Sequence, residues 1–173
     1  WSGFNYQGKM ALLCVLEMIN SIADKSVLAN YWVELEKTED FMIGQSHAVL
    51  ALYQVKAVLS HADLNYYVQD RKNSNGTLRP SIAEELMIHR PETHYPTAKC
   101  YLVSAVEIKD WDTGINPYKS EVTLYRHHGA VVHVWEVRKK ITDEIRQYCL
   151  NFGLPTTDVH INAMYGEICL FLD

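Results

Sequence analysis

The spacing of apolar residues predicts one helix followed by three strands in the first third of the chain. Over residues 5–23 the apolar side chains recur at helical spacing. Residues 31–36 alternate between two faces, as a half-buried strand does, and residues 41–43 and 49–58 read as two further strands. Because short connections favour antiparallel neighbours, we expect a three-stranded meander. The helix should pack on one face of this meander through Leu12, Leu16 and Ile19.

The middle of the chain adds a short helix and further strands. Ser81 followed by Glu84 predicts a helix start, because the two side chains can satisfy each other's backbone N–H groups. Residues 98–108 read as a long strand that we expect to extend the same sheet. Residues 121–126 and 130–134 are predicted to form a hairpin.

The last part of the chain reads as two helices. Residues 135–150 carry an apolar stripe that includes Val137, Ile141 and Ile145, and we expect this stripe to cover the sheet. Residues 161–172 also fit a helix, although a strand at the very end is an alternative. Together these elements predict a mixed α/β fold, with residues 1–173 as a single domain and additional helices at its C-terminal end.

The composition fits one folded domain in a reducing compartment. The chain has 173 residues, of which 48% are hydrophobic, so it can bury a sizeable core. The best apolar run is interrupted by Glu17 and Asn20 and falls short of the roughly 18 residues that a membrane span needs. Four widely spaced cysteines without a Cys-x-x-Cys pair indicate buried free thiols and a cytoplasmic location. Because the chain begins at Trp1, we expect it to be a piece of a longer protein.

The third predicted strand carries polar residues that suggest a metal site. Gln54 and Lys56 are two residues apart, so they emerge on one face of an otherwise apolar strand, where they need partners. Carboxylate and amide oxygens can hold Mg²⁺, and a neighbouring lysine can orient the attacking water or offset phosphate charge. The alternative is a solvated strand face with a turn residue before the second strand. The candidate acids lie just upstream: Glu34, Glu36, Glu39 and Asp40.

These residues resemble those of a known nuclease superfamily. The opening Gly3-Phe4-Asn5-Tyr6-Gln7, the acid Asp40 and the strand Gln54-Val55-Lys56 resemble the PD-(D/E)xK nucleases. They are most similar to the N-terminal nuclease domains of CBASS-type and ABC-three-component antiphage effectors. The resemblance covers residues 3–58 and implies a restriction-endonuclease-like core, in which a helix, a three-stranded antiparallel meander, a helix and a strand follow one another.

The resemblance also implies an activity and a role for each matching residue. It implies a Mg²⁺- or Mn²⁺-dependent DNA endonuclease, the effector domain of a prokaryotic antiphage system. Asp40, Gln54 and Lys56 correspond to the catalytic residues, with Asp40 and Gln54 on the metal, while Gln7 and Glu34 correspond to supporting residues. DNA would be the substrate. A sensor or ATPase domain, or a further copy of the chain, would be a possible partner, and no membrane is involved.

Other features of the sequence limit or compete with this hypothesis. The net charge of −5 argues against a broad phosphate-binding surface, and Gln54 stands where many of these nucleases have an acid. The alternative function is therefore a catalytically inactive nuclease-like module that serves protein interaction or assembly. The sequence contains no glycine-rich phosphate loop and no serine elbow. His127, His128 and His133 match no zinc motif, so they are interpreted as surface or hairpin residues.

Overall fold

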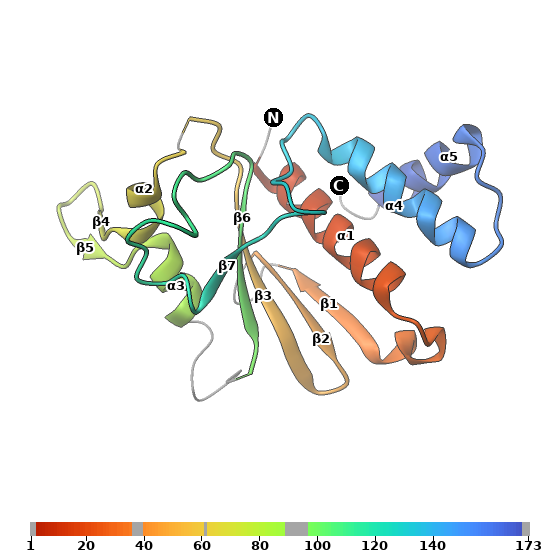
Figure 1. Ribbon diagram of the computed structural model, residues 1–173, viewed down its shortest axis with the longest axis horizontal. Helices are drawn as coiled ribbons and strands as arrows, with labels where there is room; N and C mark the ends of the chain where they lie inside the picture. Colours follow the sequence, from red (N-terminus) through yellow and green to blue (C-terminus); the bar gives the residue numbers. More distant parts are fainter. Residues whose placement is uncertain (1–2, 36–39, 61, 89–96, 171–173) are drawn as a thin grey trace.

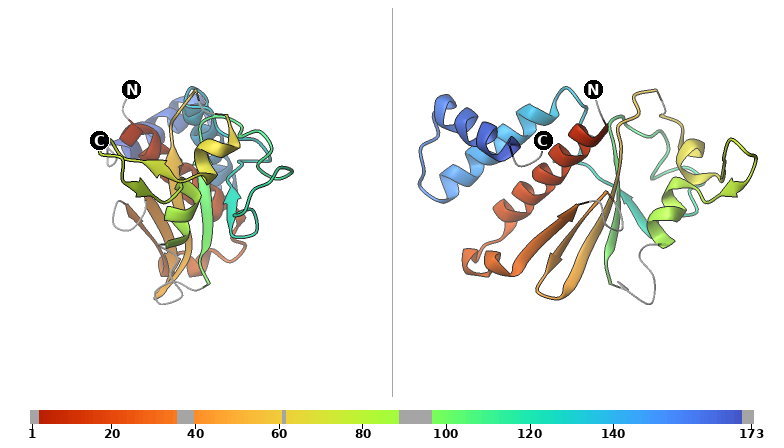
Figure 2. Two further views of the ribbon diagram at one scale, coloured as in Figure 1. Left: turned by 90° about the vertical axis from the view of Figure 1, so that its left-hand side faces the viewer. Right: turned by 180° about the vertical axis from the view of Figure 1, so that it is seen from behind.

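The protein forms three layers with a mixed sheet in the middle (Figure 1). The computed structural model describes residues 3–35, 40–60, 62–88 and 97–170. The sheet has five strands in the order β1-β2-β3-β6-β7. Figure 2 shows the longer helices on one side of this sheet and the short helices on the other. The strands of the sheet are β1 (Tyr31–Leu35), β2 (Phe41–Gln45), β3 (Ala48–Lys56), β6 (Lys99–Ser104) and β7 (Val122–Leu124).

The helices divide between the two faces of the sheet. A small separate hairpin and the connecting loops lie with α2 and α3 on one face of the sheet. A 3-10 helix, η1 (Lys25–Asn30), connects α1 to β1. The helices are α1 (Gly3–Ser21), α4 (Val137–Asn151) and α5 (Asp158–Cys169) on one side, and α2 (Leu64–Val68) and α3 (Ile82–Ile88) on the other. The hairpin consists of β4 (Arg71–Lys72) and β5 (Leu78–Arg79).

The predicted meander is confirmed, and the predicted hairpin is wrong. β1, β2 and β3 pair antiparallel in sequence order, and β6 joins β3 in parallel, as expected for a strand that extends the sheet. β7 pairs in parallel with β6, so it does not turn back on residues 130–134. Val122 and Leu124 are buried in the core beneath the sheet, and this burial favours pairing with β6. His127 and Ala130 form an isolated bridge.

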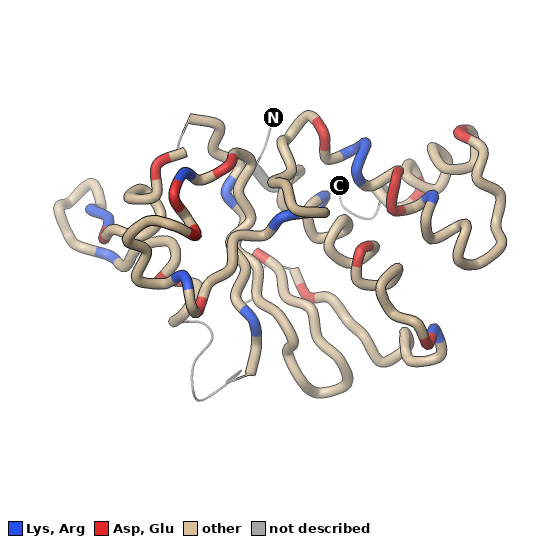
Figure 3. The backbone as a smooth tube through the Cα atoms, viewed as in Figure 1, with Lys and Arg blue, Asp and Glu red and all other residues tan. Residues whose placement is uncertain are grey.

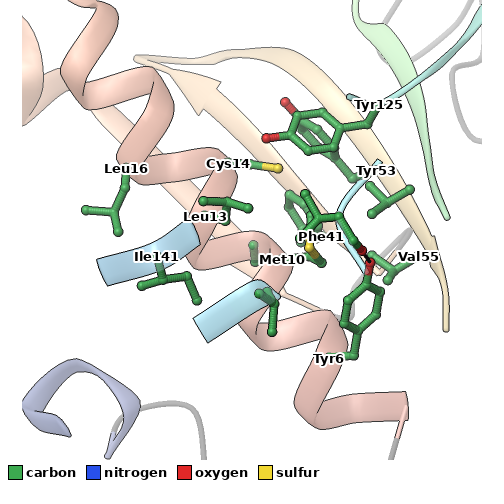
Figure 4. Packing of buried hydrophobic residues seen from close by; sticks show 14 of the residues in the cluster. Tyr6, Met10, Leu13, Cys14, Leu16, Phe41, Tyr53, Val55, Tyr125 and Ile141 are labelled. Atoms are coloured by element: carbon green, nitrogen blue, oxygen red, sulfur yellow. Dashed lines mark hydrogen bonds between the residues drawn. The ribbon is translucent and has the colours of Figure 1, made fainter. Parts of the chain in front are cut away.

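Helix α1 has a wide apolar surface because it is covered on two sides. Tyr6, Met10 and Leu13 are fully buried, and their spacing is that of one helix face. Figure 4 shows them in one cluster with residues of the sheet and of α4. Leu16 is buried as predicted, whereas Leu12 and Ile19 are only half-buried, so the face against the sheet is rotated from the predicted one.

Helix α4 packs on α1 and does not cover the sheet. Its predicted apolar stripe is fully buried, with Val137, Ile141 and Ile145 each at most 2% exposed. The prediction that this stripe lies on the sheet is wrong, because α1 already occupies that face (Figure 1). Helix α5 follows as the outermost element, which confirms a helix near the C-terminal end.

A second core lies on the opposite face of the sheet. Met42, Leu52 and Leu102 point from three neighbouring strands into this core, where Leu86 of α3 covers them. The predicted helix start is confirmed, because the backbone N–H of Glu84 donates to the hydroxyl of Ser81 at 3.1 Å. Helix α2 was not predicted. It begins where the Asp63 carboxylate accepts from the N–H of the residue two positions on.

Aromatic rings stack across the sheet on the α1 side. Phe41 of β2 and Tyr53 of β3 are register partners, and their ring centres lie 4.3 Å apart with an interplanar angle of 11°. Tyr53 also stacks on Tyr101 of β6, its register partner on the other side, at 5.0 Å. The three rings form an aromatic ladder over β2, β3 and β6, and such cross-strand pairs stabilise one particular register.

The remaining sequence predictions concern cysteines and membrane spans. Cys14, Cys100 and Cys149 are buried free thiols, as predicted, and Cys169 is half-buried. Among the helices of the described residues, none combines the length and the apolar character needed to cross a membrane.

Candidate functional site

Asp40 lies immediately before β2, directly against the end of β3. Phe41 is paired with Tyr53, so the residue before Phe41 faces the segment that starts at Gln54. The Asp40 carboxylate oxygen Oδ2 accepts a hydrogen bond of 2.5 Å from the backbone N–H of Val55. A strand N–H needs an acceptor when it is removed from water, and here a side chain provides one. The Asp40 carboxylate therefore contacts β3 at Val55, the residue between Gln54 and Lys56.

Helix α1 contacts the same position through Gln7. The side-chain amide of Gln7 donates a hydrogen bond of 2.9 Å to the backbone carbonyl of Asp40. This contact joins two parts of the resemblance motif that are 33 residues apart. Gln7 is therefore positioned to fix the backbone on which the acid is mounted.

Gln54 and Lys56 lie on the face of the sheet that α3 covers. Leu52 belongs to that core, and every second residue of a strand shares its face. Gln54 is 8% exposed, and its side-chain oxygen Oε1 has no hydrogen-bond partner among the residues that the structure describes. A buried amide oxygen without a partner costs about 1–3 kcal/mol. Lys56 is half-buried and is the register partner of Ser104.

Glu34 lies on β1, on the far side of β2 from Gln54 and Lys56. It pairs with Met42 of β2, and Met42 points into the core beneath α3, so Glu34 shares that face. Asp40 is two residues before Met42, which makes Glu34 a diagonal cross-strand neighbour of Asp40, with about 7–8 Å between such positions. Two further acids suggested by the sequence, Glu36 and Glu39, lie outside the described residues.

Asp40, Gln54 and Lys56 are neighbours where β2 begins and β3 ends, because the Asp40 carboxylate contacts the backbone of Val55. Their side chains offer a carboxylate, a buried amide oxygen and an ammonium group. Comparison with known proteins adds nothing to this: no family model, no curated protein and no solved structure matches the chain.

A second group of polar residues lies on the other side of the molecule, between α1 and α4. His127, His128 and Glu144 offer ligand atoms that all lie within 4.8 Å of one another, so they could hold a metal ion. The ring nitrogen Nε2 of His127 lies 2.9 Å from Glu144 Oε1, and that of His128 lies 3.2 Å from the same oxygen. His127 is 2% exposed, so the interpretation as a surface residue is wrong for it, although its bridge to Ala130 places it at the base of a tight turn.

Asn20 and the two imidazoles determine the charge of Glu144. Burial disfavours the ionised carboxylate, but hydrogen bonds from Asn20 and His127 outweigh burial, so the pKa of Glu144 lies below its ordinary value. No local sequence pattern indicates this group, because Glu144 follows the histidines by 16 and 17 residues on a different element. His133 does not belong to the group: its Nδ1 lies 2.8 Å from the carbonyl oxygen of Ala105.

Proposed function

We propose that this protein is a Mg²⁺- or Mn²⁺-dependent DNA endonuclease of the PD-(D/E)xK type, acting as an effector in prokaryotic antiphage defence. The observation that carries the proposal is the contact between the Asp40 carboxylate and the Val55 amide, which places the acid between Gln54 and Lys56. The order of elements supports it, because α1, the β1–β3 meander, α3 and β6 follow one another as in the core of these nucleases.

The residues present fit a hard divalent cation. Mg²⁺ prefers oxygen ligands, and the site offers the Asp40 carboxylate and the Gln54 amide oxygen. The Gln54 Oε1 atom is buried and has no partner in the described part of the chain, so a cation would satisfy an atom that is otherwise costly to bury. Mn²⁺ takes the same kinds of ligand.

Each residue has a task in phosphodiester hydrolysis. A bound Mg²⁺ would polarise the phosphoryl group and supply positive charge to it. The Lys56 ammonium orients the attacking water and offsets the charge that develops on the phosphate oxygens. Gln7 holds the backbone of Asp40 in place. These tasks require Lys56 and Asp40 to reach one phosphate, and the contact between Asp40 and Val55, the residue before Lys56, supports this requirement.

The overall charge limits how such an enzyme binds DNA. Acidic and basic residues are interspersed along the described chain (Figure 3), and the net charge is −5. Non-specific DNA affinity depends mainly on contacts between lysine or arginine and phosphate. Binding by this domain would therefore depend on the metal, on Lys56 and on whatever longer protein or partner carries the domain.

Plasmid cleavage by the full-length protein tests the proposal. With Mg²⁺ or Mn²⁺ present, Lys56→Ala should reduce cleavage by on the order of a thousandfold, and EDTA should abolish cleavage by the wild type. The matched control is Lys99→Ala. Lys99 is an exposed lysine on the adjacent strand β6, at the opposite end from the Lys56–Ser104 pair, so its loss should leave cleavage unchanged.

The same experiment distinguishes the second candidate function. Gln54 in place of an acid favours an inactive nuclease-like module used for protein interaction or assembly, because an amide binds a divalent cation less strongly than a carboxylate does. Cleavage that persists in Lys56→Ala, or that EDTA does not inhibit, would exclude the proposed mechanism. A full-length protein that never cleaves DNA, with or without its activating partner, would favour the inactive module.

A further inference from the structure

We propose that His127, His128 and Glu144 form a zinc site that is separate from the nuclease site. This inference goes beyond the proposed function and does not depend on it. The three residues converge between α1 and α4, at a cavity of about 520 Å³ that α1, the 127–128 turn and α4 line together. Gln54 and Lys56 of the proposed nuclease site lie on the opposite face of the sheet, which α3 covers.

The distances within the group fit a tetrahedral metal centre. Zn²⁺ binds histidine nitrogen and carboxylate oxygen at about 2.0–2.2 Å, so two ligand atoms on a tetrahedron lie about 3.3 Å apart. The two imidazole Nε2 atoms lie 2.9 and 3.2 Å from Glu144 Oε1. All three ligand atoms lie within 4.8 Å of one another, so a cation between them would draw the two imidazoles toward each other.

The backbone at His128 is arranged so that neighbouring imidazoles reach the same oxygen. Successive side chains of an extended chain point to opposite sides. Here His128 has a φ of 50°, in the left-handed region that a non-glycine residue rarely adopts, and the two ring centres lie 4.1 Å apart. Such a conformation costs on the order of 1–3 kcal/mol. The conformation belongs to a tight turn, because His128 and Gly129, with φ values of 50° and 86°, are the two central residues between His127 and Ala130, which form a bridge. This turn holds the two imidazoles side by side, where both reach Glu144 Oε1.

The carboxylate is held in the orientation that a ligand needs. The Asn20 side-chain amide donates to Glu144 Oε2 at 2.6 Å and to the Glu144 backbone carbonyl at 3.0 Å. These bonds engage one carboxylate oxygen and direct the other, Oε1, toward the imidazoles. Metal-binding carboxylates typically have such hydrogen-bonded partners. Asn20 is therefore a positioning residue for the site.

The ligand set selects a class of metal and leaves one coordination position open. Two imidazole nitrogens and one carboxylate favour Zn²⁺ over Mg²⁺ or Ca²⁺, which prefer oxygen ligands. Two histidines and a glutamate, with a fourth position for water or substrate, are also the ligand set of some hydrolytic zinc enzymes. Three carboxylates and one lysine line the cavity, a balance that favours a cation: Glu17, Asp143, Glu144 and Lys140.

Calorimetric titration of the metal-free full chain with Zn²⁺ tests this proposal. We expect one Zn²⁺ per chain, with affinity at least tenfold weaker in His128→Gln and in Glu144→Gln. His128→Gln is the decisive variant because the side chain is exposed and its loss should not disturb folding. His47→Gln is the matched control, since His47 is exposed in the turn between β2 and β3 and should bind Zn²⁺ as the wild type does.

The outcome does not depend on nuclease activity. Zinc located by anomalous diffraction between the His127 and His128 rings would support the site, and millimolar Mg²⁺ should not displace it. Absence of zinc binding by the wild type would overturn the proposal. So would equal affinity in the wild type and His128→Gln, because zinc would then be bound elsewhere. Neither result would affect the test of Lys56, which measures DNA cleavage.

Discussion

Replacing Asp40 by alanine and by asparagine should separate its structural contribution from the contribution of its charge. Alanine removes the acceptor of the Val55 N–H, and Val55 is only 8% exposed. A buried donor left without a partner costs about 1–3 kcal/mol. We therefore expect Asp40→Ala to lose about 2 kcal/mol of unfolding free energy. For a protein of this size that corresponds to a melting temperature lower by roughly 4–8 °C.

Asparagine keeps an oxygen acceptor of nearly the same shape and removes the charge. The Asp40→Asn variant should therefore lose no more than about 1 kcal/mol, the difference between a charged and a neutral hydrogen bond. Both variants should lose DNA cleavage by on the order of a thousandfold, because the proposed cation requires the carboxylate. Urea and thermal unfolding measure the first effect, and plasmid cleavage by the full-length protein measures the second.

Two results would refute this reasoning about Asp40. An Asp40→Ala variant that unfolds at the wild-type temperature would show that the bond to Val55 contributes nothing to stability. Cleavage retained in Asp40→Asn would show that the negative charge is not needed, and the metal-binding role of Asp40 would then be wrong.

Three further predictions concern Gln54, Glu144 and the thiols. Gln54→Glu should bind Mn²⁺ at least tenfold more tightly in a calorimetric titration, because the substitution adds a second carboxylate beside Asp40. Without metal this variant should unfold at a lower temperature, because the added carboxylate is buried. Unchanged Mn²⁺ affinity would contradict the metal role of Gln54. Because the pKa of Glu144 is lowered in the folded protein, its ionised carboxylate stabilises the fold at pH values above about 4.3, the pKa of an unfolded glutamate. This stabilisation is lost as the pH falls through the lower pKa that Glu144 has in the folded state. Urea midpoints at pH 6 and pH 3 should therefore differ less in Glu144→Gln than in the wild type, and an equal difference would contradict the assignment. A thiol reagent should modify only Cys169 rapidly in the native protein, because the other three cysteines are buried and inaccessible to the reagent. Burial also raises the pKa of the Cys14 thiol, which lowers its reactivity. Rapid modification of a second cysteine would contradict this packing.

The sequence was sufficient to predict most elements of the fold, although not α2, and it did not predict all of their partners. Periodicity identifies a face that must be buried, and it does so correctly for α4 at Ile141 and Ile145. Periodicity does not state what covers that face, and here α1 lies between α4 and the sheet. The parallel pairing of Val122–Leu124 with β6 was missed for the same reason, because a short apolar segment is compatible with several strand partners.

The two candidate sites differ in how far the sequence predicts them. Asp40 and Gln54 come together because short turns fix the register of a meander, and this follows from local sequence. The contact of His127 with Glu144 depends on how α4 lies against α1, which no local pattern specifies. The unpartnered oxygen of Gln54 likewise becomes visible only when its neighbours are placed.

The aromatic ladder affects how losses of function in this protein should be interpreted. Phe41 and Tyr53 adjoin Asp40 and Gln54 in sequence but point to the opposite face of the sheet. A strand that slips by one residue exchanges its two faces, so the rings that hold β2 and β3 in register also keep the polar residues on the α3 side. A genetic screen would therefore recover inactivating substitutions at ring positions that never meet a substrate. Such hits would report misalignment of the strands and should not be read as a nucleobase-stacking surface.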